Sequence, residues 1–198
     1  MSRCAICNAN TNNREPATVT PIVSKRCLDR VYIDLMDFTS QPEDSYKYIL
    51  QVKDHFSRMV WLYALREKSS GEVARCMCIW FSLNGSPCAI YCDNGTEFQG
   101  DFDDLVENRN PPIPVIRGRA YHPQSQGSIE VYNREFKRHL AALRIERGML
   151  SWLQLLPELQ EVTNTTGSHM LPNHVTPFEV WFGRKPHWLF KKTLGDPK

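Results

Sequence analysis

The sequence predicts an α/β domain in which a mixed sheet, three antiparallel strands plus two parallel ones, is flanked by helices. Three observations lead to this class. Residues 31–65 contain three successive strand-like segments, and the segments between them are too short for a parallel crossover. Residues 88–92 form a short apolar run typical of a buried parallel strand. Between and after these segments, apolar residues recur at helical spacing.

The first half of the expected core is a meander of three strands. They cover residues 31–38, 46–52 and 59–65. The segment 40–45, which contains Pro42 between polar residues, has the composition of a turn. A hairpin around residues 54–57 is expected to join the second strand to the third.

The second half alternates helices with short extended pieces. Ser69 is a suitable N-cap for a helix that Asn84-Gly85 ends. After the apolar strand at 88–92, a helix over about 97–107 and an extended piece at 111–116 are expected. The longest helical pattern covers 125–147, and a further helix covers 151–163. Residues 172–188 are expected to be irregular with local helical turns.

Length and composition are consistent with one globular core. The chain has 198 residues, of which 41% are hydrophobic, and this allows one sizeable core. The expected division is a polar N-terminal segment at 1–26, the core at 27–190 and a tail at 191–198. No apolar run approaches the roughly 18 residues of a membrane span, and the first residues lack a secretory signal. We therefore expect a protein of the nucleus or cytosol with no membrane partner.

The cysteines are expected to be reduced. Their number, seven, is odd, and no signal peptide precedes them. Cys76, Cys78, Cys88 and Cys92 lie among apolar residues. The sequence therefore predicts that these four are buried as small hydrophobic side chains.

Charge is unevenly distributed along the chain, although the net charge is only +2. Residues 93–107 contain six acids and no lysine or arginine. Residues 117–147 contain seven bases, among them Arg119 and Arg138, against three acids. An acidic stretch beside a basic one fits a metal site next to a polyanion track. Two solvated faces of an ordinary domain would give a similar pattern.

Three carboxylates occupy positions suited to metal binding. Asp34 lies mid-strand between apolar residues, Asp93 ends the apolar strand, and Glu130 lies near the start of the long helix. Magnesium prefers such hard oxygen ligands, and phosphoryl transfer to DNA commonly uses two cations about 4 Å apart. Each acid also has an ordinary explanation: a paired strand acid, a turn aspartate, and a glutamate favoured by the helix dipole.

Five sequence blocks resemble those of retroviral and long-terminal-repeat retrotransposon integrases. The three signature blocks are Val31-Tyr-Ile-Asp34-Leu-Met-Asp-Phe38, Ile90-Tyr-Cys-Asp93-Asn-Gly-Thr-Glu-Phe98 and Tyr121-His-Pro-Gln-Ser-Gln-Gly-Ser-Ile-Glu130. The blocks at 54–58 and 176–186 resemble the gypsy-type branch. Thirty-six residues separate Asp93 from Glu130, one more than is usual in the family. The resemblance covers roughly residues 4–188.

The resemblance implies a ribonuclease-H-like fold and a metal-dependent integrase. Asp34, Asp93 and Glu130 would be the catalytic, metal-binding triad, holding two Mg²⁺ or Mn²⁺ ions when DNA is bound. The implied activity is 3′-end processing and strand transfer of element DNA into target DNA, by a nuclear homo-oligomer. Two alternatives remain open: a related cut-and-paste transposase of the DDE type, and a host-domesticated domain that binds nucleic acid or protein without catalysing.

The long helix is expected to bury one side and present bases on another. Its apolar residues recur at spacings of three and four, namely Ile129, Tyr132, Phe136, Leu140 and Leu143. Glu130, Arg134 and Lys137 follow the same spacing on a different face. Together with Arg138 and Arg119, these bases are the expected contacts to DNA phosphates. The resemblance adds Gln124 and Gln126, in the loop before the helix, as expected DNA contacts.

Two acids compete for the first metal position. Strand alternation places Asp34 on one face and Asp37 on the other, near the polar end of the strand. The family block selects Asp34, and Asp37 is expected to be in contact with water.

Cys4 and Cys7 have the spacing of half a zinc site. The resemblance implies that residues 1–26 are the remnant of an N-terminal zinc module whose histidine pair is missing. Zinc binding by this chain is therefore not expected.

Overall fold

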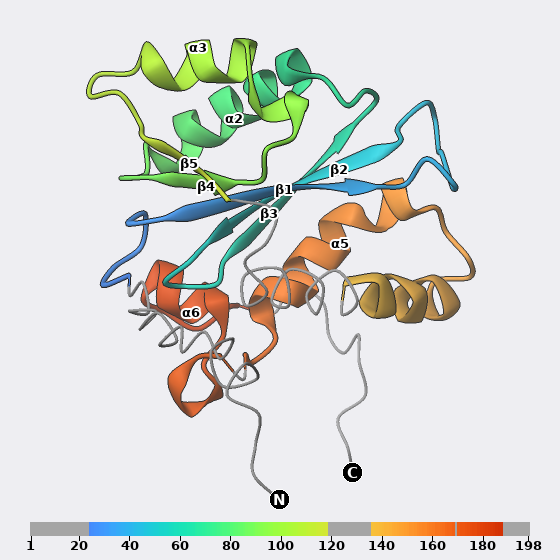
Figure 1. Cartoon of the computed structure of the whole chain (residues 1–198). Helices are drawn as coiled ribbons and strands as arrows, with labels where there is room; N and C mark the ends of the chain where they lie inside the picture. Colours follow the sequence, from blue (N-terminus) through green and yellow to red (C-terminus); the bar gives the residue numbers. More distant parts are fainter. Residues whose placement is uncertain (1–23, 119–135, 169, 188–198) are drawn as a thin grey trace, which may run out of the picture.

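The core of the fold is a mixed sheet of five strands in the order β3-β2-β1-β4-β5 (Figure 1). The computed structural model describes residues 24–118, 136–168 and 170–187. The strands are β1 (Val31–Asp37), β2 (Tyr48–Asp54), β3 (Val60–Leu65), β4 (Ile90–Cys92) and β5 (Val115–Arg117). The pairs β1–β2 and β2–β3 are antiparallel, whereas β1–β4 and β4–β5 are parallel. The predicted combination of three antiparallel strands with two parallel ones is confirmed.

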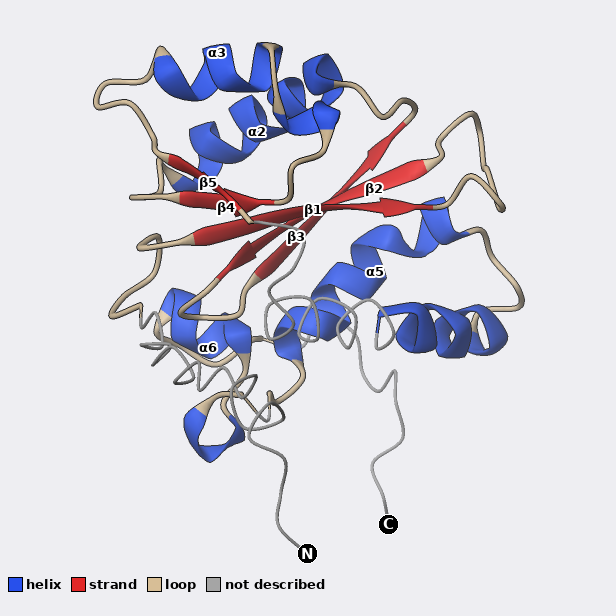
Figure 2. Cartoon of the chain, viewed as in Figure 1, coloured by secondary structure: helices blue, strands red, loops and turns tan. Residues whose placement is uncertain are grey.

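Helices cover both faces of this sheet (Figures 1 and 2). The helical elements are α2 (Ser70–Asn84), η1 (Thr96–Phe98), α3 (Asp101–Glu107), residues 136–146, α5 (Trp152–Thr165), η2 (Pro172–His174) and α6 (Pro177–Phe182). Helices α2 and α3 lie on one face, which we call the α2 face. Helix α5 and the helix at 136–146 lie on the other, the α5 face. None of the described helices is long and apolar enough to span a membrane.

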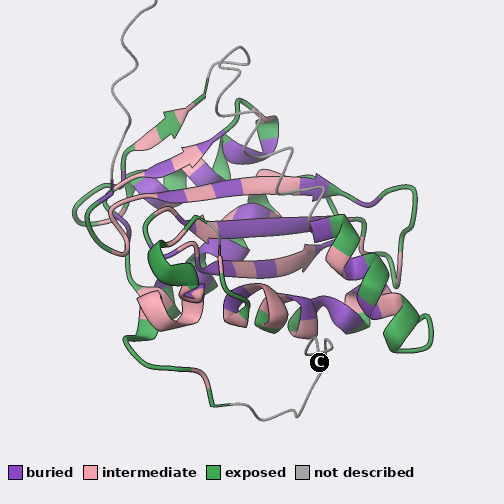
Figure 3. Cartoon of the chain, turned by 90° about the horizontal axis from the view of Figure 1, so that it is seen from below, coloured by how far each residue is buried: buried purple, intermediate pink, exposed green. Residues whose placement is uncertain are grey.

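Strand alternation divides the interior into two cores, one on each face. Val31 and Ile33 of β1 belong to the core beneath α2 and α3. Met36 belongs to the core on the α5 face, with side chains of helix 136–146 and α5. Figure 3 shows buried residues gathered in the sheet and on the helix sides turned toward it. Alternate residues of a strand therefore point to opposite faces of the sheet, and a neighbour of known face tells which face a side chain occupies.

Strand β3 forms one edge of the sheet, and amide side chains of α5 bond to its free backbone groups. Asn164 accepts a hydrogen bond from the backbone N–H of Val60 at 2.8 Å and donates one to its carbonyl at 2.7 Å. Gln160 accepts from the N–H of Leu62 at 2.7 Å. An uncovered edge strand presents unpaired backbone groups that can pair with another chain. These two amides satisfy part of that edge.

A buried aspartate closes the β2–β3 hairpin. Asp54, which is fully buried, accepts hydrogen bonds from the N–H of Leu28 at 2.8 Å and from both N–H and hydroxyl of Ser57 at 2.7 Å. Arg58 follows with a left-handed φ of 65°. The carboxylate has a partner for each oxygen, so it can be buried at the turn. Strand β2 extends to residue 54, two residues beyond the predicted end, because Lys53 and Asp54 pair with β1.

Two predictions about local structure are wrong. The helix expected over 97–107 is two elements, because Gly100 adopts a φ of 56° between η1 and α3. Cys76 and Cys92 are buried as expected, but Cys78 and Cys88 are exposed. Cys78 lies on the outer side of α2, whose buried residues are Val73, Cys76, Met77, Trp80 and Phe81. Cys88 precedes the point where β4 enters the sheet.

Candidate active site

Asp34 lies in the middle of β1 on the α5 face. It lies two residues before Met36 on the strand, and Met36 packs in the core on that face, so the two side chains point to the same side. The side chain is partly buried, and its antiparallel neighbour on β2 is Gln51. Asp37, at the end of the strand, points to the opposite face of the sheet and is exposed. Asp37 accepts a 2.7 Å hydrogen bond from the N–H of Thr39, and hydrogen bonds from Thr39 lower its pKa.

Asp93 follows β4 directly, and its side chain is directed to the same face of the sheet as that of Asp34. Ile90 and Cys92 belong to the core on the α2 face, so the alternate position, Asp93, is directed to the α5 face. Strands β1 and β4 pair in parallel with Val31 opposite Ile90. The paired register ends at Tyr32 and Tyr91, and its continuation by two further residues would set Asp34 opposite Asp93. Neighbouring strands lie about 4.8 Å apart, a separation that suits carboxylates sharing a metal cluster.

The segment Asp93-Asn94-Gly95 is a turn held by its own side chains. Asp93 Oδ1 accepts a hydrogen bond from the N–H of Gly95 at 2.9 Å. The Asn94 amide donates to the carbonyl of Gly118 at 3.0 Å. Gly118 N–H in turn donates to the carbonyl of Cys92 at 2.9 Å. The turn is thereby fixed to the end of β5, where the segment leading to Glu130 begins.

A buried glutamate supports the same turn. Glu97 is 2% exposed, and its Oε1 lies 3.2 Å from Nζ of Lys68. This hydrogen bond is the main cause that raises the pKa of Lys68, and the charge of Asp93 contributes further. A Cβ on Gly95 would come within 2.5 Å of the Glu97 carboxylate. A side chain at position 95 would therefore displace the Glu97 carboxylate from its position beside Lys68.

Sequence reasoning did not single out Glu97 or Lys68. Glu97 is one of six acids between residues 93 and 107, and nothing in the spacing separates it from its exposed neighbours. Lys68 comes from the connection between β3 and α2. Only the fold brings the two together.

The described part of the long helix has the predicted two sides. Phe136, Leu140 and Leu143 are buried in the core on the α5 face. Lys137 and Arg138 are exposed. The remaining predicted site residues lie outside the described residues, namely Glu130, Arg134, Gln124, Gln126, Arg119, Cys4 and Cys7.

The donor chemistry of the described residues fits a hard divalent cation. Asp34 and Asp93 supply carboxylate oxygens, the ligands that Mg²⁺ prefers, and Mg²⁺ retains several waters beside one or two protein carboxylates. In the described parts of the chain, no group of three or more His, Cys, Asp or Glu side chains forms a metal cluster. The predicted third ligand, Glu130, is not among those residues.

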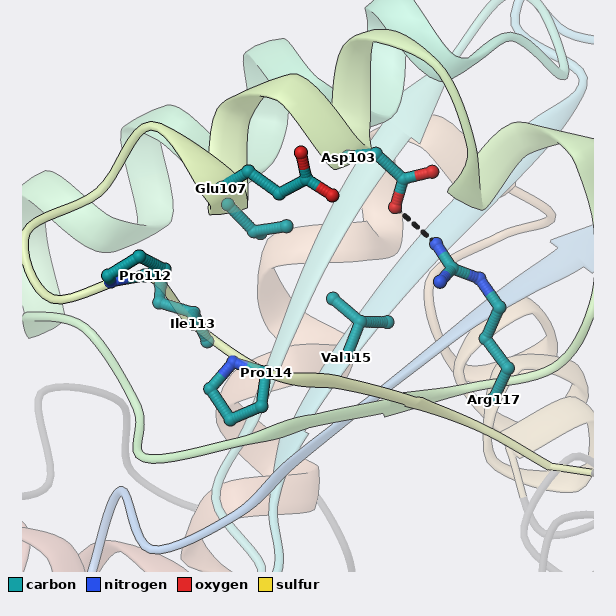
Figure 4. A pocket seen from close by; sticks show the side chains of 8 residues that line it. Asp103, Glu107, Pro112, Ile113, Pro114, Val115 and Arg117 are labelled. Atoms are coloured by element: carbon teal, nitrogen blue, oxygen red, sulfur yellow. Dashed lines mark hydrogen bonds and ion pairs between the residues drawn. The ribbon is translucent and has the colours of Figure 1, made fainter.

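A cavity of about 330 Å³ lies elsewhere, between α3 and β5 (Figure 4). It is lined by Asp103, Val106, Glu107, Pro112, Ile113, Pro114, Val115 and Arg117. Arg117 forms an ion pair with Asp103 at one end. Val115 packs against the core on the α2 face, so this cavity lies across the sheet from Asp34 and Asp93. We do not assign it to the candidate active site.

Comparison with known proteins identifies relatives of this chain. No family profile matches it. It is 28% identical to human KRAB-A domain-containing protein 2 over 83% of this chain and 33% of that protein. It is also 28% identical to the Pro-Pol polyprotein of feline foamy virus over 92% of this chain and 16% of the polyprotein. The chain thus spans a third or less of these relatives.

Solved structures decide the fold. The HTLV-2 integrase catalytic core domain in complex with magnesium, in a trimeric form, matches with a TM-score of 0.64 and 19% identity, over 80% of this chain and 99% of that one. The chain has the fold of a retroviral integrase catalytic core. A chain of the simian T-cell lymphotropic virus intasome in complex with PP2A regulatory subunit B56 gamma matches at 0.73 with 18% identity. That match covers 98% of this integrase-like core and 69% of the other chain. The predicted ribonuclease-H-like class is confirmed.

Proposed function

We propose that this integrase-like core is a divalent-metal-dependent DNA integrase, which processes 3′ ends of element DNA and transfers them into target DNA. The observation that carries the proposal is the placement of Asp34 and Asp93 on neighbouring parallel segments. Asp34 lies on β1, Asp93 directly follows β4, and strand alternation directs both side chains to the α5 face. Glu130, which lies outside the described residues, would complete the triad. Relatives among retroviral Pol polyproteins support the same activity.

Each part of the site has a task in this reaction. Asp34, Asp93 and Glu130 would hold the cations. Two divalent cations, when bound, stabilise the attacking and leaving oxygens of an in-line displacement at phosphorus. The hydrogen bond from Gly95 orients one oxygen of Asp93, which leaves the other oxygen for the metal. The Lys68–Glu97 ion pair lies close to Gly95 in the turn after Asp93.

A reverse-reaction assay tests the proposal. A branched DNA that mimics the product of strand transfer can be resolved without knowledge of the element's own ends. We expect the 198-residue chain to resolve it in Mg²⁺ or Mn²⁺, and to lose this activity with a chelator. Resolution that persists in the chelator would contradict the proposal. A DDE-type transposase, the related alternative, would instead cut both strands at intact element ends.

Lys137 is expected to contribute to the DNA track, together with Arg134. Lys137 is exposed at the start of the described part of the long helix. Each lost phosphate contact should reduce the slope of log affinity against log salt by about one unit, with similar effects on all sequences. We expect Arg134→Ala and Lys137→Ala to behave in this way in fluorescence anisotropy with duplex DNA. Arg75→Ala, exposed on α2 across the sheet, is the matched control. An unchanged slope in the double variant would exclude this helix from the track.

A second candidate is a domesticated integrase-derived domain without catalysis. The observation that favours it is the similarity to a human protein, KRAB-A domain-containing protein 2. Such a domain would bind DNA or a protein partner but would not resolve branched DNA at any Mg²⁺ or Mn²⁺ concentration. The same assay therefore separates the two functions.

Three further features are part of the proposal. The protein would act in the nucleus, where integration takes place, and it would act as a homo-oligomer, as the trimeric form of the HTLV-2 core suggests. The division at residues 26 and 190, and the expectation that Cys4 and Cys7 do not bind zinc in this chain, remain predictions from the sequence. Metal analysis of the purified chain would test the zinc prediction.

A further inference from the structure

A buried glutamine lies beside Asp34 on the α5 face. Gln51 is 5% exposed, and the β1–β2 register sets it directly opposite Asp34. Directly opposed residues of antiparallel strands project to the same face, with Cβ atoms about 4.5–5.5 Å apart. On its other side, Gln51 is opposite Leu62 of β3, which packs in the core on the α5 face. Both observations place the Gln51 side chain on the face of the candidate site.

The amide of Gln51 has an unpaired donor. Its Nε2 is buried and has no hydrogen-bond partner among the residues that the structure describes. The large majority of buried polar side-chain atoms have a partner, so an exception needs an explanation. Asn164 shows how this chain treats another buried amide: both its ends are bonded to the backbone of Val60. Leucine would fill position 51 without an unpaired donor. The amide at this position is therefore explained only if its Nε2 gains a hydrogen-bond acceptor when the site is occupied.

We propose that Gln51 is a positioning residue whose Nε2 donates a hydrogen bond to the Asp34 carboxylate when Asp34 holds a divalent cation. The inference rests on the proposed role of Asp34 as a metal ligand. A ligating carboxylate keeps lone pairs that point away from the metal, and a hydrogen bond to them fixes its orientation. An amide suits this task because it is neutral, whereas a lysine would compete with the cation for the same negative charge.

The inference predicts opposite effects on stability and on metal binding. Gln51→Leu removes a buried unpaired donor, so we expect the Tm to rise by about 2–4 °C. The same change should weaken Mn²⁺ binding about 10- to 100-fold, the usual cost of removing a group that supports a metal ligand. Ile49→Val is the matched control, since Ile49 lies two residues away on the same face. It should lower the Tm slightly and leave Mn²⁺ affinity unchanged.

Two measurements on the 198-residue chain test these effects. Free Mn²⁺ is followed by electron paramagnetic resonance during titration of the wild type, Gln51→Leu, Ile49→Val and Asp34→Asn. In the ¹⁵N-labelled wild type, the side-chain amide signal of Gln51 is followed as Mg²⁺ is added. We expect it to shift in step with metal binding, and not to shift in Asp34→Asn.

The outcomes separate this inference from the proposed function. If wild type binds Mn²⁺ in an Asp34-dependent manner, but Gln51→Leu binds equally well, the inference is wrong and the proposed function is unaffected. If Asp34→Asn binds Mn²⁺ like the wild type, the metal assignment is wrong and the inference falls with it. If Gln51→Leu does not fold, the amide signal in the wild type decides: an unmoved signal overturns the inference.

Discussion

Asp34→Asn and Asp93→Asn should each abolish metal-dependent resolution of branched DNA while leaving the protein as stable as the wild type. Removing a group that merely supports a metal ligand costs about 10- to 100-fold, so loss of a ligand itself should exceed that range. Asparagine is the right replacement at position 93, because its Oδ1 can still accept the hydrogen bond from Gly95. Neutralising one of several neighbouring carboxylates also relieves charge repulsion in the metal-free protein.

Asp37→Asn is the matched control for Asp34→Asn. Both residues lie on β1 in the same sequence block, but Asp37 is exposed at the strand end and accepts a hydrogen bond from Thr39. We expect Asp37→Asn to lose less than about tenfold in rate, or roughly 1.4 kcal/mol of barrier. Rates of purified variants at saturating Mg²⁺, with thermal unfolding measured in parallel, make the comparison. The reverse ranking would move the metal site to Asp37.

Strand positions of the candidate site could be predicted from the sequence because they depend on local rules. Alternation along an apolar strand separates Asp34 from Asp37, and the Asn-Gly that follows Asp93 marks the end of the next strand. The apolar stripe of the long helix likewise follows from its period, and Phe136, Leu140 and Leu143 are buried as expected. Such features are decided within a few residues of each other.

Features that depend on contacts between distant segments could not be predicted. Lys68 and Glu97 meet only after β3, α2 and β4 have been assembled. A glutamine within an apolar strand is ordinary in a sequence, and the position of Gln51 becomes informative only through its register with Asp34. The break at Gly100 was missed because helix composition continues across it, whereas a left-handed φ is a property of the assembled backbone.

Asp54→Ala should be among the most destabilising substitutions outside the apolar core. The fully buried carboxylate pairs the N–H of Leu28 and both donors of Ser57. Alanine would leave these donors without their acceptor, at a cost of about 1–3 kcal/mol for each one that remains buried. We therefore expect a loss of about 3 kcal/mol or more in the free energy of unfolding. Urea denaturation with an unchanged m-value would measure it.

Asp29→Ala provides the control for Asp54→Ala, because the two carboxylates differ chiefly in exposure. Asp29 also accepts hydrogen bonds from backbone N–H groups, those of Lys25 and Arg26. Those groups are exposed, so water can replace the lost acceptor, and little stability should be lost. Equal effects of the two substitutions would contradict our account of the hairpin. In the block at 54–58, Asp54 thus joins Ser57 of the hairpin turn to Leu28, in the segment before β1. Strand β1 is the strand that carries Asp34.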